Sequence, residues 1–187
     1  MTSSSEAVFL QGERVELKPL GRSDVSPDYL SWLNDVDVLR YRSPKSFPTT
    51  LAQLEDWVTS IPARGELVLS VRARADGRHV GNISLGTILW PHRSAELAIM
   101  IGAKDTWGKG YGTEAITLLT SHAFGTMGLH RLSATSPNPA FNASVRKLGW
   151  TQEGIRREAF FVDGRFVDFE TWGLLEQEWQ QGKGRLR

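Results

Sequence analysis

A run of alternating glycines between an apolar segment and a helical segment is the feature that most constrains this chain. It reads Trp107-Gly108-Lys109-Gly110-Tyr111-Gly112-Thr113. The segment before it, Ala95 to Ile101, is nearly all apolar, which is typical of a central strand covered on both faces. The segment after it has a helical pattern that continues to about Phe124. The order strand, glycine loop, helix indicates a fold that mixes both element types.

A loop of this kind can bind a phosphate. Glycine lets backbone N–H groups turn toward a common centre, and a helix N-terminus adds unpaired donors and a positive dipole end. A plain strand-to-helix turn would use glycines too, so the spacing alone leaves both interpretations open. Two nucleotide motifs do not match: a Walker A loop needs Ser or Thr where Gly110 stands, and a Rossmann fingerprint has G-x-G-x-x-G after the first strand.

The 187 residues suffice for one domain, and strand and helix patterns alternate along it. Strands are expected at residues 14–20, 66–74, 80–89, 95–101, 131–136, 155–162 and 166–175. Helices are expected between Asp24 and Pro44, with a face that runs to Val36, then at 50–61, 113–124 and after Pro139. The predicted order is βααβββαβαββ, a mixed α/β fold, with a flexible tail at 1–12, the domain at 13–179 and a polar tail at 180–187.

Charge and composition exclude several function classes. The 22 basic and 21 acidic residues leave a net charge of +1, which argues against nucleic acid as the main partner. The chain has no cysteine, and its four histidines are not spaced as metal pairs, so no metal is expected. The N-terminus lacks the pattern of a secretory signal and no window is apolar enough to span a membrane, so a cytoplasmic protein with no membrane partner is expected.

Several motifs together resemble the GNAT superfamily of acetyl-CoA-dependent N-acetyltransferases, and within it the RimJ/RimL-like branch. The superfamily motif Q/R-x-x-G-x-G/A matches residues 107–112, with Trp107 where Gln or Arg is usual, a replacement familiar in that branch. Further resemblance lies in 95–101, in Asn138 with Gly149-Trp150 eleven residues on, in 153–158 and in 163–168. It covers residues 13–179 and implies the GNAT fold, in which the fourth and fifth strands (95–101 and 131–136) splay apart.

The resemblance implies a site for acetyl-CoA between these two strands. The backbone of Ile99, Met100 and Ile101 would bind the pantetheine arm, and Asn138 would contact the same arm. The cofactor-binding set also includes the loop at the pyrophosphate: Trp107, Gly108, Lys109, Gly110, Tyr111, Gly112 and Thr113. Without the resemblance, Asn138 is equally well a turn or cap residue between two prolines.

The reaction requires a base for the attacking amine and donors for the developing oxyanion. By resemblance Glu96 is the base, although a lone acid at a strand end is more often simply solvated. Ser136 is given a catalytic role, while His92 at the same end and Trp32 in the opening helix are assigned to acceptor binding. Apolar residues stand at two positions of the segment after Asn138 that are often polar in the family: Phe141 for serine and Val145 for a tyrosine acid.

The predicted function is transfer of acetyl from acetyl-CoA to a primary amine, on a protein N-terminus, an amino sugar or another small molecule. Attack is direct in a ternary complex, because no cysteine is available to carry the acetyl group. One alternative is a non-catalytic acyl-CoA-binding protein, which Phe141 and Val145 favour; another, a nucleotide-phosphate binder, is opposed by the failed motif tests. Assembly into a homodimer is left open.

Overall fold

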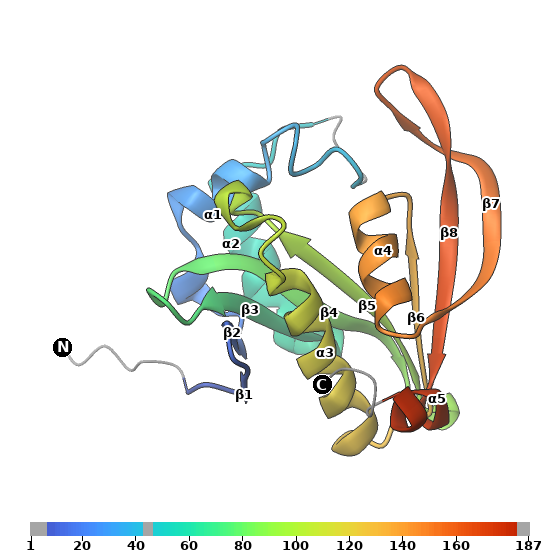
Figure 1. The fold of residues 1–187 in the computed structure, drawn as a ribbon. Helices are drawn as coiled ribbons and strands as arrows, with labels where there is room; N and C mark the ends of the chain where they lie inside the picture. Colours follow the sequence, from blue (N-terminus) through green and yellow to red (C-terminus); the bar gives the residue numbers. More distant parts are fainter. Residues whose placement is uncertain (1–6, 43–46, 183–187) are drawn as a thin grey trace.

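The computed structural model describes residues 7–42 and 47–182. Eight strands form one mixed sheet in the order β1-β2-β3-β4-β5-β6-β8-β7, with helices packed against it (Figure 1). The strands are β1 Leu10–Gln11, β2 Val15–Pro19, β3 Leu67–Ala73, β4 His79–Leu89, β5 Ser94–Ile101, β6 Arg131–Ser136, β7 Thr151–Val162 and β8 Arg165–Leu175. The helices are α1 Pro27–Trp32, α2 Leu51–Ser60, α3 Tyr111–Gly125, α4 Pro139–Lys147 and α5 Glu176–Gly182.

This order confirms the predicted mixed α/β fold, with two additional elements. Strand β1 lies within residues 1–12 and pairs with β2, Leu10 opposite Leu17. Two residues are too few for an alternating pattern to be visible in the sequence. Helix α5 follows β8 directly and buries Trp179, so regular structure continues to Gly182, beyond the predicted start of the polar tail.

The first helix is shorter than its pattern predicts. Helix α1 has six residues, with the Ser26 hydroxyl accepting a hydrogen bond from the Tyr29 N–H at 3.1 Å and Pro27 at the first helical position. Tyr29 and Trp32 are buried as expected, but Val36 is 79% exposed because the helix ends before it. The extension of the helical face to Val36 was therefore wrong. Pro44, the predicted stop, lies outside the described residues.

Strands β5 and β6 form the one parallel pair among the described strands, and they separate early. Pairing runs from Ser94 opposite Arg131 to Glu96 opposite Ser133 and then stops. Figure 1 shows the two strands running apart toward their C-terminal ends. The predicted splay of the central strands is confirmed, and it leaves residues 97–101 of β5 without a neighbouring strand on that side.

The strand register assigns the helices to opposite faces of the sheet. Ala98 and Met100 of β5 share a face with the residues that lie opposite them on β4, and α1 and α2 cover that face. Ile99 and Ile101 lie on the other face, where α3 packs; a Cβ added at Gly112 would lie 3.5 Å from the Ile101 side chain. The splay therefore opens between a helix N-terminus on one face and the α1–α2 layer on the other.

Candidate active site

The main chain of β5 alternates between its sheet neighbour and the splay. The Gly102 N–H donates to the Val80 carbonyl of β4 at 2.9 Å. Successive residues of a strand direct their backbone N–H and C=O groups to opposite sides. Met100 therefore also directs these groups to β4, while Ile99 and Ile101 direct theirs to the splay. Of the three residues expected at the pantetheine arm, the geometry therefore favours Ile99 and Ile101 and leaves Met100 engaged in the sheet.

Two side chains donate hydrogen bonds to the backbone carbonyl groups that face the splay. The Trp107 indole N–H donates to the Ile101 carbonyl at 2.9 Å, and the Arg42 guanidinium donates to the Ile99 carbonyl at 3.4 Å. Each carbonyl has a second lone pair, so both remain able to accept a further hydrogen bond. The Trp107 bond also ties the start of the glycine loop to the end of β5.

The glycine loop leads into α3, whose first three backbone N–H groups are free among the described residues. Gly108 has φ 75° and Gly110 has φ 84°, in the left-handed region that favours glycine. Gly110 is the N-cap of α3 and no side chain caps the helix. The first helical bond runs from the Glu114 N–H to the Gly110 carbonyl, and the N–H groups of residues 111–113 have no acceptor among the described residues. Three donors thus point out of the positive end of a helix.

The space beside these donors is open. A Cβ added at Gly108 or Gly110 would meet nothing within 4 Å. Lys109 is exposed, and no carboxylate of the described residues lies within ion-pair distance of its ammonium group. The loop therefore presents a cation and three N–H groups to solvent, an arrangement that suits a phosphate or pyrophosphate.

Asn138 and Ser136 both take part in the turn between β6 and α4. The Asn138 side-chain oxygen accepts from the Ala140 N–H at 2.9 Å, which makes it the N-cap of the helix. The Ser136 hydroxyl accepts from the Asn138 N–H at 3.1 Å. The cap interpretation of Asn138 thus holds, and its side-chain NH₂ group remains available to bind a further partner.

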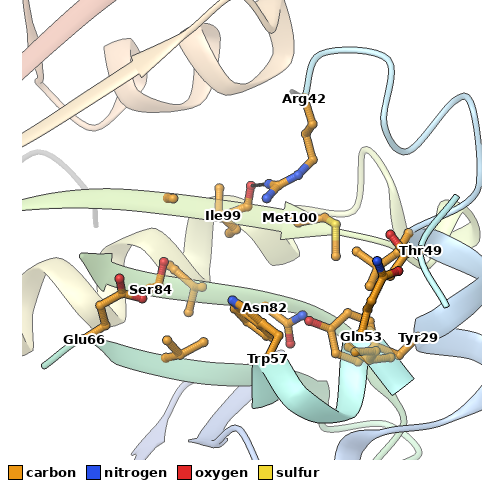
Figure 2. Close-up of a pocket in the computed structure, with 15 residues that line it drawn as sticks. Tyr29, Arg42, Thr49, Gln53, Trp57, Glu66, Asn82, Ser84, Ile99 and Met100 are labelled. Atoms are coloured by element: carbon orange, nitrogen blue, oxygen red, sulfur yellow. Dashed lines mark hydrogen bonds between the residues drawn. The ribbon is translucent and has the colours of Figure 1, made fainter. Parts of the chain in front are cut away.

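A cavity of about 290 Å³ lies between helices α1 and α2 and the face of β3, β4 and β5 (Figure 2). Ile99 and Met100 contribute to its wall, so the cavity borders the strand that faces the splay. The polar side chains along its wall are Tyr29, Arg42, Thr49, Gln53, Glu66, Asn82 and Ser84. The cavity can therefore receive a small polar molecule beside β5.

Glu96 lies on the cavity side of the sheet, at the point where the splay begins. It is opposite Gly86 on β4 and Ser133 on β6, and the Ser133 pair is the last before the strands separate. By the same register Glu66 lies opposite Gly86, and its carboxyl carbon would be 4.0 Å from a Cβ added there. The Glu96 side chain is exposed, and none of the described groups bonds its carboxylate. Glycine at position 86 leaves space between two carboxylates that the sheet holds in one row.

A hydrogen-bonded chain runs from the partly buried His79 through Asn82 to Tyr29 at the cavity wall. The His79 Nε2 lies 2.9 Å from the Gly81 carbonyl and 2.8 Å from the Asn82 side-chain oxygen, so this nitrogen carries the hydrogen. The Asn82 amide lies beside the Tyr29 hydroxyl (Figure 2). Burial raises the pKa of Tyr29 to about 12, partly offset by the Arg42 charge, and burial lowers the pKa of His79. Both side chains are therefore neutral at physiological pH, and Tyr29 is available as a hydrogen-bond donor.

The structure does not bring the two predicted acceptor-binding residues to this cavity. Trp32 is 8% exposed, its ring stacks edge-on against His79 at 5.1 Å, and a Cβ added at Gly102 would lie 2.0 Å from it. It packs in the core and is absent from the cavity wall. His92 is exposed in the turn before β5, and no hydrogen bond or ion pair joins it to Glu96 among the described residues.

Helix α4 presents no proton donor at the two positions where the family often has one. Val145 is fully buried and Phe141 packs against the core. The nearby Ser144 hydroxyl donates to the Ala140 carbonyl at 2.9 Å. An acid for a leaving thiolate must therefore come from another element or from solvent.

Residues 14–151 match the family model described as the acetyltransferase (GNAT) domain. The chain belongs to the GNAT acetyltransferase family. It is 22% identical to the uncharacterized N-acetyltransferase YoaA of Bacillus subtilis over 173 residues, 90% of this chain and 97% of that protein. It is 29% identical to the spermidine N(1)-acetyltransferase of Escherichia coli K12 over 155 residues, 81% of each chain.

A solved structure of the spermidine N-acetyltransferase from Vibrio cholerae, in complex with CoA and spermine, has the same fold. The TM-score is 0.80 at 24% identity, over 90% of this chain and 99% of that one. This GNAT enzyme is therefore an acyltransferase that uses acetyl-CoA as its cosubstrate. In the part of the chain that the structure describes, no helix is long and apolar enough to cross a membrane.

Proposed function

We propose that this GNAT enzyme transfers acetyl from acetyl-CoA directly to a primary amine in a ternary complex, as a member of the RimJ/RimL-like branch. The observation that carries the proposal is the splay between β5 and β6. Carbonyl groups of Ile99 and Ile101 face it, the open N-terminus of α3 lies at one end, and the cavity borders it. A long cosubstrate and a small acceptor can therefore meet beside β5.

The cosubstrate would bind mainly through the main chain. The N–H groups of residues 111–113 and the Lys109 ammonium would hold the pyrophosphate. The free lone pairs of the Ile99 and Ile101 carbonyls would accept from the amides of the pantetheine arm, and the Asn138 NH₂ group would donate to it. Trp107 holds the loop in place through its bond to Ile101.

Glu96 would serve as the base. The amine nitrogen attacks the thioester carbonyl carbon, forming a C–N bond, and Glu96 takes the proton that the nitrogen loses. The C–S bond then breaks and CoA leaves as a thiolate. A thiol has an ordinary pKa of about 8.5, so the thiolate can leave and take a proton from solvent without a dedicated acid. This is compatible with Val145 and Phe141 on α4.

The alternative of a non-catalytic acyl-CoA-binding protein rests on the apolar Val145 and Phe141, whereas the family match supports an acyltransferase. A protein of this kind would retain the glycine loop and the splay but release no CoA from acetyl-CoA. Three properties remain predictions from the sequence: a cytoplasmic location, a possible homodimer, and an acceptor among N-terminal amines, amino sugars and other small amines.

The two candidates are separated by a turnover assay. The protein is incubated with acetyl-CoA and, in turn, a peptide with a free N-terminus, an amino sugar and a polyamine, while CoA thiol release and the mass of each amine are followed. Release that depends on an amine, with an acetyl group added to it, supports the enzyme. Binding of acetyl-CoA in a calorimeter with no amine-dependent release would support the non-catalytic candidate.

A further inference from the structure

The acceptor cavity has opposite charges on its two sides. Glu66 stands beside β4, in the same cross-strand row as Glu96, and Arg42 reaches over β5 toward the Ile99 carbonyl (Figure 2). Both Glu66 and Arg42 line the cavity wall. The inference drawn from this pair rests on the proposed function, since it concerns the acceptor of that reaction.

The positive charge of Arg42 is not neutralised by a neighbouring carboxylate. Among the described residues none lies within ion-pair distance of its guanidinium group, and its bond to the Ile99 carbonyl is long at 3.4 Å. The acids on the same segment are already paired: Asp35 and Asp37 bind the Lys104 ammonium at 2.7 and 3.3 Å. The guanidinium therefore remains able to bind an anion from outside.

Two other side chains of the cavity wall can also donate hydrogen bonds. Gln53 uses its side-chain oxygen to accept from the Thr50 N–H at 2.9 Å, so its NH₂ end is the free one. Tyr29 is neutral and Arg42 is near enough to influence its pKa, so its hydroxyl can donate as well. One guanidinium, one amide NH₂ and one phenol on the same cavity wall suit carboxylate or phosphate oxygens.

The side of the cavity that carries Glu66 suits the reacting amine of the acceptor. Glu66 and Glu96 flank Gly86, and Glu96 is at the start of the splay, where the proposed attack occurs. Glu66 is bound to Arg64 at 3.0 Å, but Glu96 has no cation bound among the described residues. From Glu96 to Ile99 is three residues, or about 10 Å along an extended strand. An α-amino acid is too short to place its amine and carboxylate that far apart.

We propose that the acceptor is a primary amine with an anionic group, a carboxylate or a phosphate, about 10 Å from the reacting nitrogen. Arg42 binds the anion, and Glu96 and Glu66 face the amine. A polyamine would instead place its second ammonium group beside an uncompensated guanidinium, where like charges repel. The acceptor class thus differs from the spermidine for which the E. coli and V. cholerae relatives are named.

Four acceptors of one chain length test the proposal: 6-aminohexanoate, 6-aminohexyl phosphate, hexylamine and 1,6-diaminohexane. The ratio of kcat/KM between an anionic and a neutral acceptor is measured for the wild-type protein and for Arg42→Gln and Arg42→Glu. We expect the better anionic acceptor to exceed hexylamine by at least tenfold and the diamine by more, and the two anionic acceptors distinguish carboxylate from phosphate. Arg42→Gln should remove this preference, and Arg42→Glu should reverse it toward the diamine.

Arg40→Gln is the matched control. Arg40 lies two residues away and pairs with Asp37 and Asp163, and it is not part of the cavity wall, so the ratio should be unchanged. Two results would overturn the proposed acceptor class and leave the proposed function standing. One is a wild-type preference for hexylamine or the diamine, and the other is the same kcat/KM ratio in the wild type and in Arg42→Gln. Absence of CoA release with all four amines would count against the proposed function together with it.

Discussion

The two halves of the proposed active site are built from different chemical groups. On the proposed cosubstrate side, most of the binding groups are backbone carbonyl and N–H groups, and the positive φ values at 108 and 110 favour glycine. On the proposed acceptor side, the cavity wall includes side chains from α1, α2, β3, β4 and β5, together with Arg42. The first half depends on the fold and the second on residue identity.

This difference explains how one fold can serve several acceptors. Backbone groups persist through most substitutions, so the proposed pyrophosphate site depends little on side-chain identity. A cavity wall of side chains changes with each substitution. Variants on the acceptor side should therefore alter turnover or selectivity and leave CoA affinity intact, while variants in the loop should do the reverse.

The largest expected effect is on the acceptor side, at Glu96. Glu96→Gln keeps the shape and removes the proton acceptor, so kcat should fall by roughly 10²–10⁴ at neutral pH. The loss should shrink at high pH, where more of the amine is already neutral. Stopped assays from pH 7 to pH 10 measure it, and calorimetry should give unchanged affinity for CoA.

Glu55→Gln, on the exposed side of α2, is the control for Glu96 and should leave turnover unchanged. Wild-type turnover in Glu96→Gln at neutral pH would exclude Glu96 as the base. An equal loss at every pH would indicate that Glu96 positions the acceptor, because removal of a proton would not then be the impaired step.

The next effect is on the cosubstrate side. Gly110→Val puts a branched side chain at φ 84°, beside the donors of residues 111–113, and CoA affinity should fall at least tenfold, about 1.4 kcal/mol. Gly77→Val is the matched control, because Gly77 has φ 71° and open space but lies in the turn between β3 and β4. Equal CoA affinity in the two variants would remove the loop from the site.

The smallest effect concerns Tyr29 and the pH dependence of stability. The unfolded chain ionises this phenol near its ordinary pKa of 10.0 and the folded protein near 12, so the folded state holds the proton longer and stability falls as pH rises from 10 to 12. Between pH 9 and pH 11 the wild type should lose about 1.4 kcal/mol more unfolding free energy than Tyr29→Phe. Urea unfolding at both pH values measures this, and an equal fall in the two proteins would show that the buried phenol keeps its ordinary pKa.

The sequence predicted the local structure of the proposed cosubstrate half, a strand, a glycine loop and a helix, because these signals are local. Alternating glycines, an apolar strand before them and a helix after them lie in one continuous segment, and the order of elements follows from hydrophobic period and turn residues. The orientation of the Met100 backbone could not be read from the sequence. It follows from the pairing register with β4, which directs the Met100 N–H and C=O groups into the sheet.

The acceptor half could not be predicted in the same way. Arg42, Glu66 and the chain from His79 to Tyr29 come from separate elements, and only the packing of α1 and α2 on the sheet brings them to one cavity. The sequence also left the role of Trp32 open, because an aromatic residue in an amphipathic helix has the same pattern whether it packs in the core or faces a ligand. Its position against Gly102 decides in favour of packing.

A structure of the protein with CoA bound tests the central claim most directly. The account predicts the pyrophosphate within hydrogen-bond distance of the N–H groups of residues 111–113, and the pantetheine arm along Ile99 and Ile101 between β5 and β6. It also predicts that the arm ends beside Glu96. A pyrophosphate bound away from the glycine loop, or an arm outside the splay, would contradict the claim that backbone groups form the cosubstrate half of the site.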